Sequence, residues 1–160
     1  EDAEEAVKAV RMEPKGVSGY RMDRRNAYVG ATANAADVVK MCDDAVVALM
    51  VEKKQAVENL EEILSVNGVD MVQFGPSDYS VSISVPGDYA NPKVKEAELK
   101  TIKTALKMDV APRAEIGRPE DAKRYLDLGV RNFSLGTDVG ILNMYWKNNG
   151  AELKKLLSAI

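Results

Sequence analysis

Short runs of apolar residues alternate along this chain with longer segments in which apolar positions recur every three or four residues. The apolar runs lie at 45–52, 71–74, about 110–115 and within 131–138, and each has the length of a buried strand. The periodic segments between them read as helices. Strands that alternate with helices at this spacing predict a parallel α/β sheet with right-handed crossovers.

The helices follow from apolar periodicity together with start and stop signals. Acidic residues open the first helix, Asn67-Gly68 ends the third, and Pro119 opens the fifth. The predicted helices cover residues 2–10, 31–42, 54–66, 93–107, 119–129 and 139–159.

Three stretches are less regular. Residues 13–30 are rich in glycine, proline and charge and predict a long loop. Residues 81–92 alternate as a strand would, but their proline and glycine content makes a loop equally plausible. Gly75-Pro76, taken alone, predicts only a turn.

Four strands in 160 residues suggest part of a larger architecture. A parallel (β/α)8 TIM barrel has eight strands and typically about 250 residues, so the chain corresponds to the second half of one, strands 5–8. We expect residues 1–160 to form a single α/β domain. A small flavodoxin-like sheet is the competing architecture, but its glycine-rich phosphate loop after the first strand is not evident.

Composition narrows the functional classes. The net charge of −3 comes with both signs interspersed, so there is no basic stripe for nucleic acid. No apolar run approaches the roughly 18 residues that a membrane span needs, and no targeting segment is evident. The single cysteine, Cys42, excludes an internal disulfide and fits a reducing compartment, so we expect a cytoplasmic protein.

The sequence contains no histidine. This excludes the Ser-His-Asp and Cys-His arrangements and every histidine-ligated metal centre. A metal bound by this chain would have oxygen ligands, which suit hard cations such as Mg²⁺ or Mn²⁺.

Two acidic residues follow consecutive predicted strands, Glu52 after the first and Asp78 shortly after the second. Residues just past the carboxyl ends of parallel strands converge on one face, where active sites lie. Two adjacent carboxylates repel unless a cation lies between them or one is protonated. The structural alternative is that Asp78 caps a turn or helix and Glu52 begins a helix, where the macrodipole favours an acid.

The amino-acid sequence of these segments resembles that of the HpcH/HpaI class II aldolase family. The segment "VEKKQAVENLEEILSVNGVDMVQFGPSDYSVSISVPG" matches a pattern of a strand ending in a metal-binding Glu, a helix with N-x-(D/E)-E-I, then GVD and GP-x-D-(L/Y)-S. "PKGVSGY", "RRNAYVG" and "AKRYLDLGVRNFSLGTD" are similar to three further family segments. The resemblance therefore extends through most of the chain.

The resemblance implies pyruvate-type aldol chemistry. Glu52 and Asp78 would hold a divalent ion, Mg²⁺ or Mn²⁺ and possibly Co²⁺, that chelates a pyruvate-like 2-oxo acid and stabilises the enolate formed on carbon–carbon cleavage. The backbone around Gly75, Pro76 and Ser77 would receive the substrate carboxylate, because glycine permits a close approach.

The chain also departs from the family pattern. The family's catalytic base, a His-Asp pair, and its arginine lie in the first half of the barrel, so we expect both upstream of this chain. Ser84 stands where a glycine is usual, Ser18 replaces an arginine, and Asn91-Pro92 replaces His-Pro. Glu115 takes the place of an apolar residue that packs on substrate, and is either a further acid in the site or a solvent-facing residue.

Other positions are interpreted structurally. Arg24, Arg25 and Tyr28 border the site in relatives, but a solvated helix start is the favoured interpretation here. Asp138 has the position of a helix N-cap. Tyr145 and Trp146, in the last helix, are expected to pack against another subunit or the barrel, and the resemblance implies a homo-oligomer, perhaps a hexamer.

Three hypotheses follow. The first is a metal-dependent aldolase, or its C-terminal half, that cleaves a 4-hydroxy-2-oxo acid to pyruvate and an aldehyde. The second keeps the fold but cleaves malyl- or citramalyl-type acyl-CoA esters, although nothing in the sequence marks a CoA site. The third is a non-catalytic half barrel that acts as a binding or assembly partner.

Overall fold

The computed structural model describes residues 1–19 and 34–159, which divide into two compact units, Glu1–Arg113 and Ala114–Ile160. The expected class is confirmed, because the strands are parallel and alternate with helices. Strand order follows the sequence, β1-β2-β3-β4. In the described residues no helix is long and apolar enough to cross a membrane.

The first unit contains a parallel sheet. Its strands are β1 (Ala48–Val51), β2 (Met71–Phe74) and the first half of β3 (Ala111–Ile116). Val51 pairs with Phe74 in the β1–β2 register, and Gln73 pairs with Arg113 in the β2–β3 register. Because the strands are parallel, the residues that follow β1 and β2 emerge at the same edge of the sheet.

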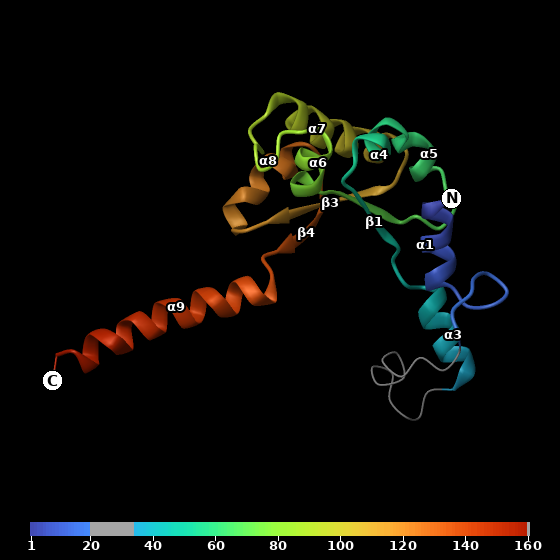
Figure 1. The fold of residues 1–160 in the computed structure, drawn as a ribbon. Coiled ribbons are helices and arrows are strands. Elements are labelled where there is room, and N and C mark those ends of the chain that lie inside the picture. Colours follow the sequence, from blue (N-terminus) through green and yellow to red (C-terminus); the bar gives the residue numbers. More distant parts are fainter. Residues whose placement is uncertain (20–33, 160) are drawn as a thin grey trace. The chain divides into compact units, whose positions relative to one another are not determined.

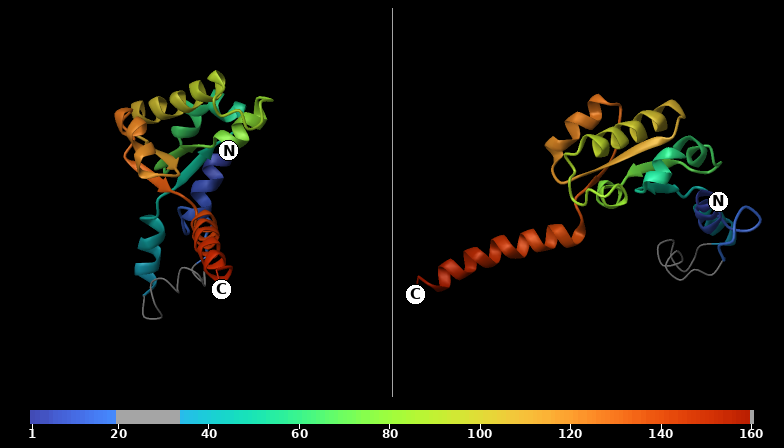
Figure 2. Two further views of the ribbon diagram at one scale, coloured as in Figure 1. Left: turned by 90° about the vertical axis from the view of Figure 1, so that its left-hand side faces the viewer. Right: turned by 45° about the horizontal axis from the view of Figure 1, so that its top comes forward.

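Helices cover this sheet on one side, and Figure 1 shows α4, α5, α6 and α7 grouped there. The two views in Figure 2 show α7, in yellow, lying along the strands. The helices of the first unit are α1 (Asp2–Val10), α3 (Ala35–Asp43), α4 (Lys54–Glu58), α5 (Leu60–Leu64), α6 (Pro76–Ser82) and α7 (Pro92–Lys107).

The core of the first unit forms between α7 and the sheet. Val51, Val72 and Phe74 from the strands pack with Leu60 from α5 and Val94 from α7. Each of these side chains is at most 7 % exposed. At about 25 cal/mol per Å² of apolar surface, full burial of one such side chain contributes about 1.5–3 kcal/mol. This face of the sheet is therefore fixed by packing, and the opposite face is left for other roles.

The structure decides three expectations about local structure: two are corrected, and for residues 81–92 the loop alternative is confirmed. Residues 54–66 do not form one helix, because Asn59 leaves helical geometry (φ −97°, ψ 22°) and separates α4 from α5. Residues 81–92 are not a strand; they contain the end of α6 and a loop. The turn expected at Gly75-Pro76 instead opens α6, since proline at the first helical position fits the required φ.

Arg11 joins the N-terminal helix to the sheet. Its guanidinium donates hydrogen bonds of 2.7 Å to the carbonyl oxygens of Cys42 and Ala45. It also lies 3.7 Å from the Asp70 carboxylate, which accepts a 2.8 Å bond from the Val47 backbone N–H. These contacts hold together the segments that immediately precede β1 and β2.

The second unit contains the rest of β3, a 3-10 turn (Pro119–Asp121), α8 (Ala122–Asp127), β4 (Asn132–Leu135) and α9 (Asp138–Leu157). The N-cap expected at Asp138 is wrong: Thr137 caps α9 by accepting a 3.1 Å bond from the Gly140 N–H. Asp138 is the first helical residue instead. α9, drawn in red in Figure 1, has no buried residue.

Candidate active site at the carboxyl ends of β1 and β2

Glu52 and Gly75 lie side by side just beyond the paired ends of β1 and β2. Val51 and Phe74 are register partners, and the Gly75 N–H donates a 2.9 Å bond to the Val51 carbonyl. A Cβ on Gly75 would lie 2.9 Å from Glu52 Cβ and 3.0 Å from Glu52 Oε2. The backbone at Gly75 is in the ordinary extended region (φ −103°). Glycine is thus required here because the Glu52 side chain crosses it.

Asp78 lies in the first turn of α6, three residues after Gly75. Its side chain is exposed, whereas Glu52 is partly buried and Gly75 is buried. Gly75 occupies the N-cap position and supplies no side-chain cap. Asp78 is therefore not the N-cap, and its carboxylate is placed where the helix dipole favours a negative charge.

A second contact links the two segments that carry these acids. The backbone N–H of Lys54, at the start of α4, donates a 2.9 Å bond to Ser82 Oγ at the end of α6. Lys53 caps α4 without a side-chain bond, so Ser82 supplies an acceptor for one otherwise unpaired N–H of the first turn. The bond ties the segment that follows Glu52 to the helix that carries Asp78.

A buried serine organises the loop after α6. Ser80 is fully buried; its hydroxyl donates a 2.7 Å bond to the Ser77 carbonyl and accepts a 3.0 Å bond from the Gly87 N–H. The loop thereby returns to the start of α6, where Tyr89 Oη lies 3.3 Å from Ser77 Oγ. Sequence reasoning missed Tyr89, because nothing local in "PGDYANP" signals that it reaches this helix.

Ser84, expected from the resemblance to occupy a glycine position, has the left-handed backbone that glycine tolerates best, with φ +63°. It follows the C-cap of α6. Its N–H bonds to the Val81 carbonyl at 3.0 Å, and the next N–H, from Val85, bonds to the Ser80 carbonyl at 2.8 Å. These are the two bonds of a Schellman motif, which usually has glycine at this residue.

The sheet face that carries Glu52 also presents a row of three side chains. Met50, Gln73 and Arg113 are register partners across β1, β2 and β3. Met50 and Gln73 each lie one residue before the last residue of their strand, and Met50 Sδ comes within 3.3 Å of the position of a Cβ on Gly75. Side chains two residues apart on a strand point to the same face, so the sequence alone would have predicted that Met50 and Gln73 share a face with Glu52 and Gly75. Their partner on β3, Arg113, could be identified only from the strand register.

The remaining expected site residues have different outcomes. Pro76 and Ser77 are exposed in the first turn of α6. Glu115 belongs to the second unit, where its side chain is exposed on β3. Arg24, Arg25 and Tyr28 lie outside the described residues. Within residues 1–19 and 34–159 there is no group of three or more acidic, cysteine or histidine side chains that could hold a metal.

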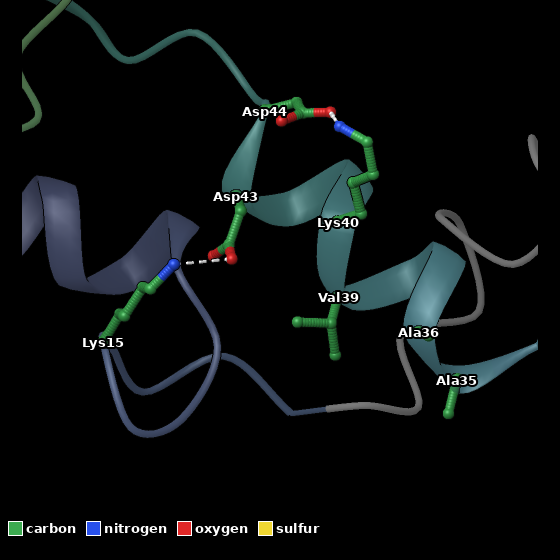
Figure 3. A pocket seen from close by; sticks show the side chains of 7 residues that line it. All are labelled: Lys15, Ala35, Ala36, Val39, Lys40, Asp43 and Asp44. Atoms are coloured by element: carbon green, nitrogen blue, oxygen red, sulfur yellow. Dashed lines mark hydrogen bonds and ion pairs between the residues drawn. The ribbon is translucent and has the colours of Figure 1, made fainter.

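A depression of about 570 Å³ lies elsewhere, between α3 and the loop after α1 (Figure 3). Its charged side chains are mutually paired: Lys15 with Asp43 at 2.7 Å, and Lys40 with Asp44. The hydrogen bond to Asp44 raises the pKa of Lys40. The depression is lined by α3, which precedes β1, whereas Glu52 follows β1, so it is not part of the candidate active site.

Comparison with known proteins defines the class to which this fold and this pair of acids belong. The profile of the HpcH/HpaI aldolase/citrate lyase family matches residues 1–143. The chain belongs to this family.

Individual relatives agree with this assignment. The chain is 34 % identical over 147 residues to a 4-hydroxy-2-oxo-heptane-1,7-dioate aldolase of Escherichia coli, an alignment that covers 89 % of this chain and 54 % of that protein. A family member from Burkholderia cenocepacia superposes with a TM-score of 0.76 at 26 % identity, over 96 % of this chain and 60 % of the other. An HpcH/HpaI aldolase from Desulfitobacterium hafniense gives 0.74 at 25 %, over 92 % and 57 %. The chain thus spans about half the length of the curated relatives it matches.

Proposed function

We propose that this chain carries the metal-binding part of a class II aldolase that cleaves 4-hydroxy-2-oxo acids to pyruvate and an aldehyde. The observation that carries the proposal is that Glu52, which follows β1, lies beside Gly75, which follows the adjacent parallel strand β2. Asp78 comes three residues after Gly75. The name of the Escherichia coli relative supports this substrate class.

The donor set fits a hard divalent cation. Glu52 and Asp78 provide two carboxylates, and Mg²⁺ or Mn²⁺ is commonly held by one or two carboxylates with water and substrate oxygens. Such an ion, when bound, supplies Lewis-acid polarisation of the 2-oxo carbonyl. Co²⁺ is a further candidate on the same donor set. The absence of a side chain on Gly75 makes room for the Glu52 side chain, which lies across it.

Of the three residues Gly75, Pro76 and Ser77, only one has a backbone N–H that can receive the substrate carboxylate. The Gly75 N–H is already bonded to the Val51 carbonyl, and Pro76 has no N–H. The N–H of Ser77 lies in the first helical turn, where it has no intrahelical acceptor. We assign carboxylate binding to the Ser77 N–H, with Gly75 and Pro76 contributing shape.

The proposal is tested by binding. Mn²⁺ affinity is measured by electron paramagnetic resonance, and affinity for pyruvate or its analogue oxamate is measured at saturating Mn²⁺. Glu52→Gln and Asp78→Asn should each abolish Mn²⁺-dependent oxamate binding, because each removes one of two charged ligands. Glu61→Gln, an exposed acid on α5, is the matched control. Unchanged Mn²⁺ affinity in both ligand variants would refute the metal site.

Two alternatives share the fold. The family description includes citrate lyases, which favours an acyl-CoA lyase as the second candidate. A non-catalytic binding or assembly partner is the third, since the chain contains no histidine base. Exchange of the pyruvate methyl protons in D₂O separates them from the first proposal, because exchange requires both the metal and a working base. Metal binding without exchange would favour the third.

We also propose that the protein forms a homo-oligomer, with a hexamer as the expected state. The support is α9, which exposes large apolar side chains in its first half and again near its end. Trp146 is 67 % exposed and Leu156 is 68 % exposed. Side chains of this kind are usually covered by a partner surface.

A further inference from the structure

Arg113 is placed on the face of the sheet that carries the candidate active site. It is the register partner of Gln73, which is the partner of Met50. The neighbours of Gln73 in β2, Val72 and Phe74, pack into the core beneath α7. Side chains alternate between the faces of a strand, so Gln73 and its register partners point away from that core.

The distance from Arg113 to the site is short enough for its side chain. Gly75 lies two residues beyond Gln73 on the neighbouring strand. Two residues of strand advance roughly 6.6 Å, and neighbouring strands are roughly 4.8 Å apart, so the Cα of Gly75 is about 8 Å from that of Arg113. The arginine side chain is long enough to bring its guanidinium next to a ligand seated beside Gly75.

The charge of Arg113 is not used by the described protein. Its side chain is partly buried, and in residues 1–19 and 34–159 the guanidinium has no hydrogen bond or ion pair. The other described arginines differ in this respect: Arg11 binds two carbonyl groups, and Arg131 binds the Leu126 and Val130 carbonyl groups. A partly buried cation without a counter-charge among the described residues gains by pairing with an anionic ligand.

We propose that Arg113 is a charge-recognising residue of the active site. Its positive charge attracts the anionic 2-oxo acid and lowers the affinity of the site for the metal ion alone. The inference rests on the proposed function, because it takes Glu52 and Asp78 as the metal ligands. With a divalent cation and two carboxylates the metal site is neutral, and a bound carboxylate adds one negative charge. Arg113 offsets that charge, and before the ligand arrives it repels the cation.

This role predicts effects of opposite sign in one variant. Arg113→Gln should weaken binding of oxamate to the Mn²⁺-loaded protein about tenfold, the size expected for the loss of one attractive charge in a partly solvated site. Binding of oxamide, a neutral molecule of the same size, should not change. Affinity for Mn²⁺ alone should rise several-fold, because a repulsive charge has been removed.

The controls keep this inference separate from the metal proposal. Arg113→Lys keeps the charge and should retain most of the oxamate affinity. Lys103→Gln removes an exposed charge on α7, which packs on the other face of the sheet, and should change nothing. Glu52→Gln reports on the metal site alone: if Mn²⁺ affinity is unchanged in it, the metal proposal fails, and with it the stated role of Arg113.

Two results would contradict the role of Arg113 without contradicting the proposed metal site. Equal losses of oxamate and oxamide binding in Arg113→Gln would show a structural role only, and an unchanged oxamate affinity would show that the guanidinium does not reach the ligand. Salt provides a second measurement on the unaltered protein. Oxamate affinity should fall with ionic strength more steeply in the wild type than in Arg113→Gln, and equal slopes would overturn the proposal.

Discussion

The side chain of Glu52 crosses directly over Gly75, so close that a Cβ at residue 75 would lie 2.9 Å from Glu52 Cβ. Ordinary contacts between carbon atoms are about 3.5–4.0 Å. The nearest obstacle is the Cβ of Glu52, which is fixed to the backbone, so a larger residue must displace the strand end or turn the carboxylate. Residue 75 must therefore be glycine because the Glu52 side chain lies against it.

Gly75→Ala should therefore lower the affinity for Mn²⁺, by about tenfold, because it shifts a ligand without removing its charge. Mn²⁺ titration followed by electron paramagnetic resonance measures the effect. Gly150→Ala is the matched control, since a Cβ there meets nothing within 4 Å. Equal Mn²⁺ affinity in Gly75→Ala and the wild type would show that the Glu52 carboxylate is not a ligand.

Replacing Ser84 with glycine should stabilise the protein. Ser84 has φ +63°, a conformation that costs a non-glycine residue roughly 1–2 kcal/mol, and part of that gain is lost to the greater freedom of glycine in the unfolded chain. A net increase of about 0.5–1 kcal/mol in the free energy of unfolding is expected, measured by urea denaturation. Gly129→Ala provides the reverse test at an equivalent helix end with φ +100°, and should destabilise. A loss of stability in Ser84→Gly would contradict the strain.

Tyr79 should make stability fall at alkaline pH. Burial raises the pKa of its phenol, and the charges of Glu58 and Glu96 raise it further. Above the ordinary tyrosine value of about 10 the unfolded chain loses this proton while the native state keeps it, so the free energy of unfolding decreases as pH rises. Tyr79→Phe should remove this component, and Phe74, 5.1 Å away, would still pack on the ring.

The measurement is urea denaturation between pH 8 and pH 11, with absorbance at 295 nm to follow ionisation of the tyrosines. Tyr89→Phe, which removes a half-exposed phenol, is the control and should leave the slope nearly unchanged. Identical pH slopes for the wild type and Tyr79→Phe would show that the buried phenol does not contribute.

The apolar surface of α9 should mediate self-association. Leu142 and Trp146 are one helical turn apart and are 57 % and 67 % exposed. The double variant Leu142→Glu/Trp146→Glu should have a lower assembly mass by light scattering coupled to size-exclusion chromatography, because charged residues would have to be buried in the interface. Asn148→Glu is the control. A wild-type protein that is monomeric at micromolar concentration would refute the oligomer.

The sequence by itself determined the parallel α/β class and the two strand-end acids. Strand and helix periods are local properties, so the buried runs around Val51 and Val72 and the start of α7 were predictable. It did not predict α6, because a proline after a glycine indicates a turn as readily as a helix start. Asn59 likewise interrupts a pattern that remains apolar on one face.

Only the tertiary structure decided which residues meet at the strand ends. Register places Glu52 beside Gly75 and aligns Met50, Gln73 and Arg113, and a pairing register depends on packing between segments that are distant in the sequence. The return of Tyr89 to Ser77 through the buried hydroxyl of Ser80 is decided in the same way. Residue types thus suggested the chemistry, while the hydrogen-bonded alignment of β1, β2 and β3 determined which side chains lie on one face of the sheet.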